Sequence, residues 1–222
     1  MTLANRVTRF YPPAPSSEKL LDDNRFRALL PSEEWGRLPV ATWRRFSKRL
    51  GPGRTIVYAG EIEETTFSRY GWWLAQLTRL IGGPLPTGRE IKVPIVVTVT
   101  EDANSGGQIW TRLCARSSGF PQVIHSAKRF AGPTGLEEYV GCGIGMALTI
   151  SVEREALVFR SAGYFFEIGW LKLRLPARFT PGALTVRHID LGGGAFRFTL
   201  EVVHPRLGLL IRQSALFREV LS

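Results

Sequence analysis

The chain has 222 residues, of which 44% are hydrophobic and 22% charged, values that are typical of a globular protein and exclude a disordered chain. Its formal net charge of +10 is compatible with nucleic-acid binding, but the basic residues are scattered and only "WRRFSKR", residues 43–49, is dense. We therefore expect a dispersed basic surface and no nucleic-acid partner.

The distribution of apolar, cysteine and histidine residues narrows the class of protein further. No apolar run reaches the roughly 18–20 residues that span a bilayer, and the first residues lack the apolar segment of a secretory signal. We expect a cytoplasmic protein, for which membrane contact is not favoured. Cys114 and Cys142 form no CxxC pair and the three histidines have no zinc-site spacing, so reduced, buried thiols are expected, with no metal and no cofactor.

The N-terminal part is predicted to be extended or mobile over residues 1–17, and residues 18–222 are predicted to form a single α+β domain. Helices are expected over residues 16–30 and 38–53, the second ending at Gly51-Pro52. A strand is expected over residues 54–65.

The strongest helical pattern lies in "FSRYGWWLAQLTRLIGG", residues 67–83. Six apolar residues fall on one continuous helical stripe, and Gly82-Gly83 ends the helix. The stripe consists of Tyr70, Trp73, Leu74, Leu77, Leu80 and Ile81. The favoured interpretation is a helix that packs this stripe on the core. The alternative is an amphipathic helix lying on a membrane, with Trp72, Arg69 and Arg79 at the interface, but the polar face carries only these two cations.

After Pro86 the apolar period changes to two, which predicts strands. In residues 90–102, for example, Ile91, Val93, Ile95, Val97 and Val99 share one face. Turn signals separate about eight to ten such segments, with no helical pattern between them, which predicts an antiparallel meander. So many strands favour curling or closure. The predicted fold class is therefore α+β, with N-terminal helices followed by a large, curved, barrel-like antiparallel sheet.

Three alternating glycines, Gly141, Gly143 and Gly145, stand out in residues 132–152. A dinucleotide-binding loop would need a helix directly after the glycines, but a strand pattern follows, so that interpretation is rejected. Residues 140–152 are interpreted instead as one long strand with a bare glycine face. Glycine in a strand favours curvature or close approach of another group. We expect the Trp-rich helix, or less readily a ligand, to lie against this face.

The candidate site centres on Glu138. Glu137 and Glu138 are adjacent and point to opposite faces of a strand, and Glu138 shares the apolar face of Val140 and Ile144. A carboxylate there needs a partner, for which Arg112 and Arg129 are the candidates, and Trp110 shares the face of Arg112. Two readings stay open: an ion pair at the rim of the core, or the polar corner of a ligand pocket. The candidate ligand-binding residues are Trp110, Arg112, Arg129, Glu138, Gly141 and Gly143.

Several longer motifs resemble the bacterial family known as domain of unknown function 4166. They are "LLPSEEWGRLPVATWRRF", "GGPLPTG", the W-x-R of Trp110 and Arg112, the E-x-x-G of Glu138 and Gly141, and "HPRLGLL". The resemblance covers the chain from about Ala28 onward. Members similar to this sequence sometimes follow saccharopine-dehydrogenase-like NAD-binding domains, which implies an accessory binding role and no assigned reaction.

Three functional hypotheses follow. The first is a binding module that encloses a pocket for a small apolar or lipid-like molecule. The second is an enzyme that uses Glu138 as acid or base in that pocket. The third is a peripheral membrane or partner-docking domain that uses the helix containing Trp72 and the "WRRFSKR" segment.

Overall fold

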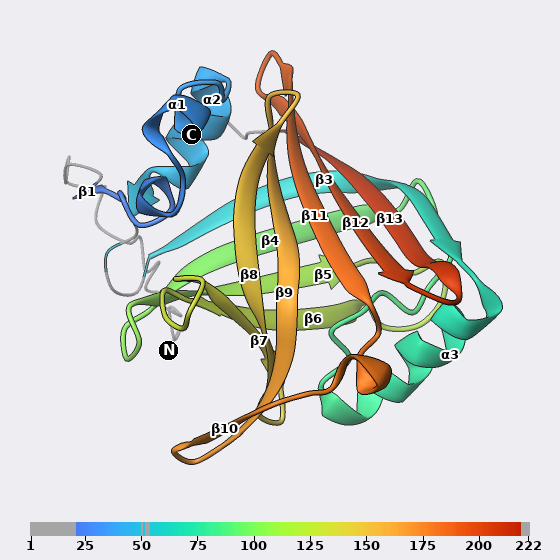
Figure 1. Cartoon of the computed structure of the whole chain (residues 1–222). Helices are drawn as coiled ribbons and strands as arrows, with labels where there is room; N and C mark the ends of the chain where they lie inside the picture. Colours follow the sequence, from blue (N-terminus) through green and yellow to red (C-terminus); the bar gives the residue numbers. More distant parts are fainter. Residues whose placement is uncertain (1–20, 50, 52–53, 219–222) are drawn as a thin grey trace, which may run out of the picture.

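The protein is a closed antiparallel barrel, seen in a computed structural model that describes residues 21–49, 51 and 54–218 (Figure 1). Ten strands follow one another around the barrel in chain order, and the last pairs with the first. They are β3 (Thr55–Phe67), β4 (Pro94–Asp102), β5 (Gly107–Cys114), β6 (Gln122–Arg129), β7 (Glu137–Gly141), β8 (Ile144–Glu153), β9 (Ala156–Ile168), β11 (Ala183–Gly192), β12 (Ala195–His204) and β13 (Gly208–Arg218). A short strand, β10 (Leu171–Arg174), pairs only with β9.

The expected antiparallel sheet after Ile91 is confirmed, and its closure is specified by the pairing of β13 with β3, from Ile211↔Phe67 to Arg218↔Ala59. In Figure 1, β8, β9 and β11–β13 form a front layer that crosses β3–β6 at a steep angle. Apolar side chains alternate into the space between the layers. In β4, for example, Ile95, Val97 and Val99 are buried whereas Ile91, before the strand, is exposed.

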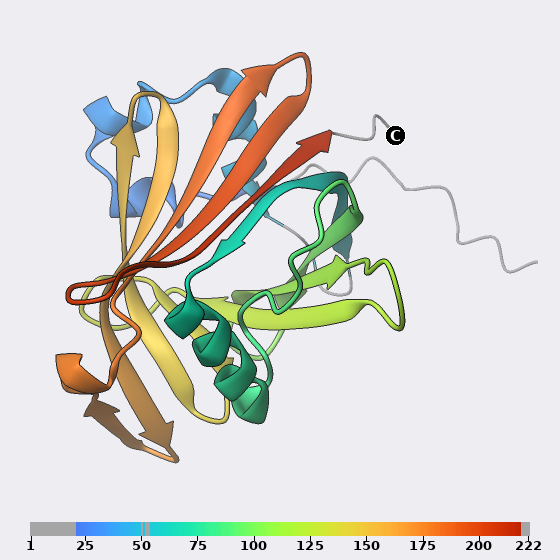
Figure 2. The ribbon, with the colours of Figure 1, turned by 90° about the vertical axis from the view of Figure 1, so that its right-hand side faces the viewer.

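Two short helices, α1 (Ser32–Trp35) and α2 (Val40–Phe46), cover one end of the barrel (Figures 1 and 2). The prediction of a helix over residues 16–30 is wrong for residues 21–30, the part that the structure describes. Residues Leu21–Asp22 form β1, which pairs with β2 (Lys48–Arg49), and Arg27–Leu29 form one 3-10 turn, η1. The buried Asp23 carboxylate accepts hydrogen bonds from the backbone and guanidinium of Arg25, which favours a turn over a helix. The segment predicted to be mobile, residues 1–17, lies outside the described residues.

The third helix, α3 (Arg69–Leu77), continues into a 3-10 turn, η2 (Thr78–Ile81), and lies between β3 and β4 in the chain. The "N-terminal helices" of the sequence prediction are therefore imprecise. Ser68 caps the helix, because its hydroxyl accepts a hydrogen bond from the Gly71 backbone N–H. Gly71 and Ala75 are the buried residues of the helix, and a Cβ at Gly71 would collide with the backbone of Leu210 in β13. The helix thus packs on the sheet through its smallest residues.

This packing contradicts the predicted orientation of the apolar stripe. Tyr70, Trp73, Leu77 and Leu80 are exposed, and only Leu74 and Ile81 are partly buried. The reason is steric: a contact through glycine and alanine lets the helix backbone approach the strand closely, and this turns the large side chains outward. The apolar period was recognised correctly, but the face that contacts the core was not.

The alternating glycines belong to a hairpin and not to one long strand. β7 ends at Gly141 and β8 begins at Ile144, and the residues between them, Cys142 and Gly143, have φ values of 48° and 76°. Positive φ at both positions is the conformation of a tight two-residue hairpin turn. Cys142 is therefore exposed, although it was expected to be buried, whereas Cys114 is buried as expected. The helical segment does approach this region, since a Cβ at Gly141 would collide with the carbonyl oxygen of Ile81.

Candidate binding site

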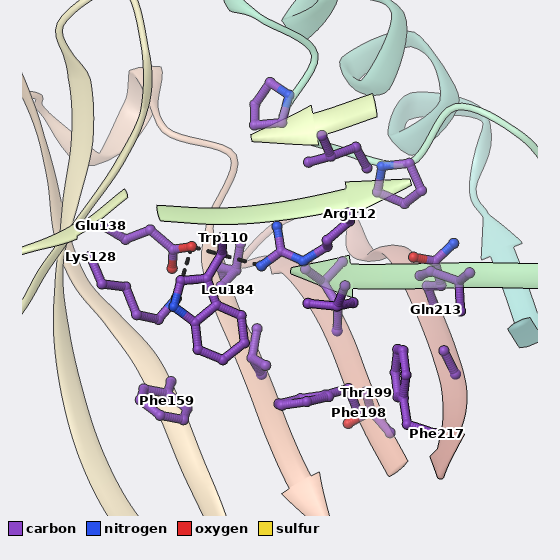
Figure 3. Close-up of a pocket in the computed structure, with 18 residues that line it drawn as sticks. Trp110, Arg112, Lys128, Glu138, Phe159, Leu184, Phe198, Thr199, Gln213 and Phe217 are labelled. Atoms are coloured by element: carbon purple, nitrogen blue, oxygen red, sulfur yellow. Dashed lines mark ion pairs between the residues drawn. The ribbon is translucent and has the colours of Figure 1, made fainter. Parts of the chain in front are cut away.

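The barrel encloses a cavity made of two adjoining spaces of about 80 and 220 Å³. Both spaces are lined by Arg112 and Glu138, and they share Pro84, Leu184, Val186 and Leu200 as apolar wall residues. The smaller space lies deeper among aromatic side chains, including Trp110, Phe159, Phe198 and Phe217 (Figure 3). The interior is therefore mostly apolar, with one charged corner.

The charged corner is formed by inward-facing side chains that lie beside one another on neighbouring strands. Lys128 in β6 and Glu138 in β7 are direct cross-strand partners, and the Lys128 Nζ lies 3.0 Å from the Glu138 Oε1. Both side chains are almost completely buried. Arg112, on the inward face of β5, places its Nη2 3.9 Å from the same oxygen (Figure 3). The Lys128 ammonium also lies 4.9 Å from the ring centre of Trp110, a favourable cation–π position.

Burial and the neighbouring charges together determine the protonation of this pair. Burial alone would raise the pKa of Glu138, but Lys128, Arg112 and Ser126 outweigh it, so the pKa lies below its ordinary value. Burial also lowers the pKa of Lys128, an effect that Glu138 opposes and Arg112 reinforces. At neutral pH the Glu138 carboxylate is therefore ionised, and its charge opposes the effect of burial on Lys128.

Arg112 is the least engaged member of the corner. Among the described residues it forms no hydrogen bond, and Glu138 at 3.9 Å is its carboxylate neighbour. Its side chain keeps 26% of its exposure and lines both parts of the cavity. The hydroxyl of Thr199, which lines the deeper space, is buried without a hydrogen-bond partner in the described part of the chain. The cavity thus presents hydrogen-bonding groups that the protein itself does not satisfy.

The larger space reaches the surface between α3–η2 and the segment that follows β10. Leu74, Thr78 and Ile81 form one side, and Leu175, Phe179 and Pro181 form the other. Phe179, in the 3-10 turn η3 (Ala177–Phe179), lines the cavity although 68% of its surface is exposed. A side chain that is exposed and also lines the cavity marks its mouth.

Of the six candidate residues predicted from the sequence, the structure brings together Trp110, Arg112 and Glu138. Arg129 lies outside the barrel, where its guanidinium stacks on the Tyr139 ring at 4.1 Å and its Nη1 lies 3.7 Å from Glu167. Gly141 and Gly143 are not among the residues that line either space.

Lys128, which the sequence analysis did not single out, holds the position that had been considered for Arg129. The alternation of residues along β6 could have predicted this position. Ile124 and Ser126 alternate inward along β6, and the same parity places Lys128 inward and Arg129 outward. Glu137, as expected, points to the opposite face from Glu138, where both its oxygens accept hydrogen bonds from Lys172 on β10.

The opposite end of the barrel holds a separate space of about 30 Å³ beneath α2. His188 is completely buried there, stacked on Phe196 at 5.0 Å. Burial, reinforced by the charge of Arg45, lowers its pKa to about 3. Asp190, on the same strand, accepts a hydrogen bond from Arg45 at 3.0 Å. His188 is therefore part of the packed core, and Asp190 pairs with Arg45.

Comparison with known proteins gives one positive result. The model of the family described as "Domain of unknown function (DUF4166)" matches residues 38–217, most of the chain and almost the whole barrel. The chain belongs to the DUF4166 family. No curated protein and no solved structure matches this DUF4166 chain.

The described part of the chain lacks two features. None of the helices in this DUF4166 domain is both long and apolar enough to cross a membrane. Within the same residues, no group of three or more His, Cys, Asp or Glu side chains is placed to hold a metal ion.

Proposed function

We propose that this DUF4166 barrel binds a small, mainly apolar molecule that carries one acidic group. The observation that carries the proposal is the Arg112 guanidinium, which faces a mostly apolar cavity without a hydrogen-bond partner in the described residues. A guanidinium offers several N–H donors in a fixed plane and pairs with carboxylates or phosphates through two parallel bonds. An acidic ligand would satisfy these donors.

The charge balance of the cavity favours an acid over a base or a neutral ligand. Three charged residues line its two parts: Arg112, Lys128 and Glu138. Glu138 is neutralised by Lys128 at 3.0 Å, which leaves the charge of Arg112 in excess. A ligand with one negative charge restores neutrality in a site of low dielectric, where an uncompensated charge is costly.

The size of the cavity sets the scale of the ligand. An apolar cavity of about 150 Å³ is large enough to bind benzene. The larger space here is about 220 Å³ and adjoins the smaller one of about 80 Å³. A medium-length acyl chain or a small ring system, with its acid at Arg112 and its apolar part toward Leu184 and Val186, suits this volume.

The alternative of Glu138 as a catalytic acid or base has less support. An effective acid or base has a pKa near the working pH. The pKa of Glu138 is lowered from its ordinary value, and the carboxylate is held by Lys128. We place the action of the protein in the cytoplasm, a reducing compartment in which the free thiols of Cys114 and Cys142 would persist.

The test is displacement of a fluorescent fatty-acid analogue by decanoic acid, decanol and decylamine. We expect decanoic acid to compete best. Arg112→Met should weaken the acid by about 10–100-fold, since hydrogen bonds to charged groups contribute about 1.5–3 kcal/mol, and leave decanol unchanged. Arg129→Met is the matched control, because that arginine lies on the adjacent strand outside the barrel. Native mass spectrometry of protein purified from cells would identify the ligand itself.

Two outcomes would contradict the proposal: one rejects the cavity as a binding site, and the other rejects its selectivity for an acid. If none of the three probes displaces the analogue, or if filling the cavity with Val186→Trp in a folded protein leaves binding unchanged, the cavity is not a binding site. If decanol competes as well as decanoic acid, and Arg112→Met has no effect on either, the cavity binds apolar molecules without selecting an acid.

A further inference from the structure

The exposed face of α3 and η2 carries more large apolar side chains than packing requires. Trp73 is 58% exposed and Leu80 is 82% exposed, and Tyr70 and Leu77 are also exposed beside them. Their helix is held on β13 by Gly71 and Ala75, so these side chains are not needed to fix it. Scattered exposed apolar residues are ordinary, whereas a contiguous group of them marks an interaction surface.

A second group of exposed apolar residues lies on the β9–β10 hairpin and η3. Trp170, at the tip of the hairpin, is 93% exposed, and Leu173 and Phe179 are exposed nearby in the chain. The hairpin is firmly attached, because Lys172 of β10 donates hydrogen bonds to the buried Glu137 of β7. Trp170 is therefore presented on an ordered support.

The two groups occupy the same end of the barrel. In Figures 1 and 2, which differ by a quarter turn about the vertical axis, α3, η3 and β10 all lie at the lower end, opposite α1 and α2. Leu74 and Phe179, one from each group's segment, both line the larger cavity space. Both groups of apolar side chains thus belong to elements at the end of the barrel where the cavity opens.

The same end carries arginines that are not neutralised. Arg69 and Arg79 are exposed on α3 and η2, and Arg174 and Arg178 are exposed on β10 and η3. Within the described residues, none of these four forms an ion pair with a carboxylate, in contrast to Lys172, which is paired with Glu137. Aromatic side chains flanked by unpaired cations are typical of surfaces that bind the headgroup region of an anionic bilayer.

We propose that this end of the barrel docks on an anionic lipid membrane, with Trp73, Leu80 and Trp170 inserted into the headgroup region and the cavity mouth facing the lipid. A second copy of the chain fits less well. A symmetric dimer places the same surface against itself, so the four arginines of each copy would be held close to those of the other without compensating carboxylates. An anionic bilayer supplies both the apolar layer and the opposite charge.

Flotation of the full chain with vesicles tests the proposal. We expect the protein to bind vesicles of phosphatidylcholine and phosphatidylserine in equal parts, and to bind pure phosphatidylcholine much more weakly, with the difference reduced by salt. Trp73→Ser/Trp170→Ser should abolish most binding. The matched control is Trp43→Ser, which removes an exposed tryptophan from α2 at the opposite end of the barrel.

A charge-reversed pair gives a second, independent readout. Arg79→Glu/Arg178→Glu should weaken binding to the anionic vesicles at least about 30-fold, since each surface cation contributes about a factor of five to membrane attraction. Arg37→Glu/Arg44→Glu, exposed cations near α1 and α2, should leave binding nearly unchanged. Far-ultraviolet circular dichroism of each variant verifies that it is folded.

The proposal is overturned if the protein does not bind the anionic vesicles, or if the control variants lose as much binding as the test variants. It is also overturned if ultracentrifugation shows a dimer that Trp73→Ser/Trp170→Ser dissociates, because the surface would then be an interface between copies. None of the altered residues lines the cavity, so displacement of the fatty-acid analogue in solution should be the same in all variants. Failure of membrane docking is thereby distinguished from failure of ligand binding.

Discussion

The substitution Glu138→Gln tests how the charged corner is balanced. In the native protein the Glu138 carboxylate lies 3.0 Å from the Lys128 ammonium, and both side chains are more than nine-tenths buried. The amide of glutamine has nearly the same shape but no charge, so the substitution leaves the ammonium buried without its counterion. Breaking a buried ion pair by removing one partner costs about 3–5 kcal/mol.

The structure favours the lower end of that range. Lys128 keeps its position 4.9 Å from the Trp110 ring, where a cation–π interaction is worth about 0.5–2 kcal/mol. The glutamine oxygen can still accept a hydrogen bond from the Lys128 Nζ, and Arg112 lies farther from Glu138, at 3.9 Å, and is partly exposed. We therefore expect a loss of about 3 kcal/mol in the free energy of unfolding, or about 6–12 °C in Tm for a chain of this size.

Urea denaturation of three variants provides the measurement. Glu138→Gln should be about 3 kcal/mol less stable than the native protein. Lys128→Met/Glu138→Gln should recover much of that loss, because the unpaired ammonium is gone. The deficit of Glu138→Gln should also narrow as the pH rises toward 10.5, the ordinary pKa of lysine. Burial lowers the pKa of Lys128 and the charge of Glu138 opposes this, so removing that charge lowers the folded-state pKa further. The difference in bound protons between the unfolded and folded states is then larger in the variant, and its stability rises more with pH than that of the native protein.

Two results would refute this reasoning. A Glu138→Gln protein that melts like the native one would mean that the pair is not buried as described. A double variant that loses stability equal to the sum of the two single variants would mean that Lys128 and Glu138 do not interact.

Three further predictions concern other parts of the barrel. Because the pKa of His188 is lowered to about 3 from 6.5, the unfolded state takes up a proton first as the pH falls, and the free energy of unfolding should decline by about 1.4 kcal/mol per pH unit below 6.5. Urea denaturation over this pH range should show a smaller decline for His188→Phe. Parallel curves for the native protein and the variant would mean that His188 does not cause the decline. Gly143→Val should destabilise the protein by about 1–3 kcal/mol more than Gly193→Val. Both glycines have positive φ, but only a Cβ at Gly143 meets the carbonyl oxygen of Glu167. Equal denaturation midpoints for the two variants would contradict this close approach of Glu167 to Gly143. Gly71→Ala should push α3 away from Leu210 of β13, because the added Cβ would collide with the Leu210 backbone. We expect faster hydrogen exchange of the backbone amides in α3. Unchanged exchange would mean that β13 moves and the helix does not.

The sequence determined the local alternation along the strands. Side chains point to opposite faces at successive positions, so the pattern of Ile95, Val97 and Val99 was enough to predict an apolar face. The same rule placed Glu138 on that face and Trp110 with Arg112 on theirs, and the structure brings these three residues to one cavity. The family resemblance was also readable, and the family match over residues 38–217 confirms it.

Only the tertiary structure decided which residues of other elements each apolar face contacts. The apolar stripe of α3 predicted a core contact, but the close approach of Gly71 to Leu210 turned Trp73 and Leu80 to the surface. The partner of Glu138 is Lys128, because the register of β6 on β7 sets them opposite each other. These outcomes depend on distances between segments that are far apart in the chain, and the closure of β13 on β3 fixes those distances. A periodic pattern records which face of an element is apolar, but what covers that face depends on contacts that are not local in sequence.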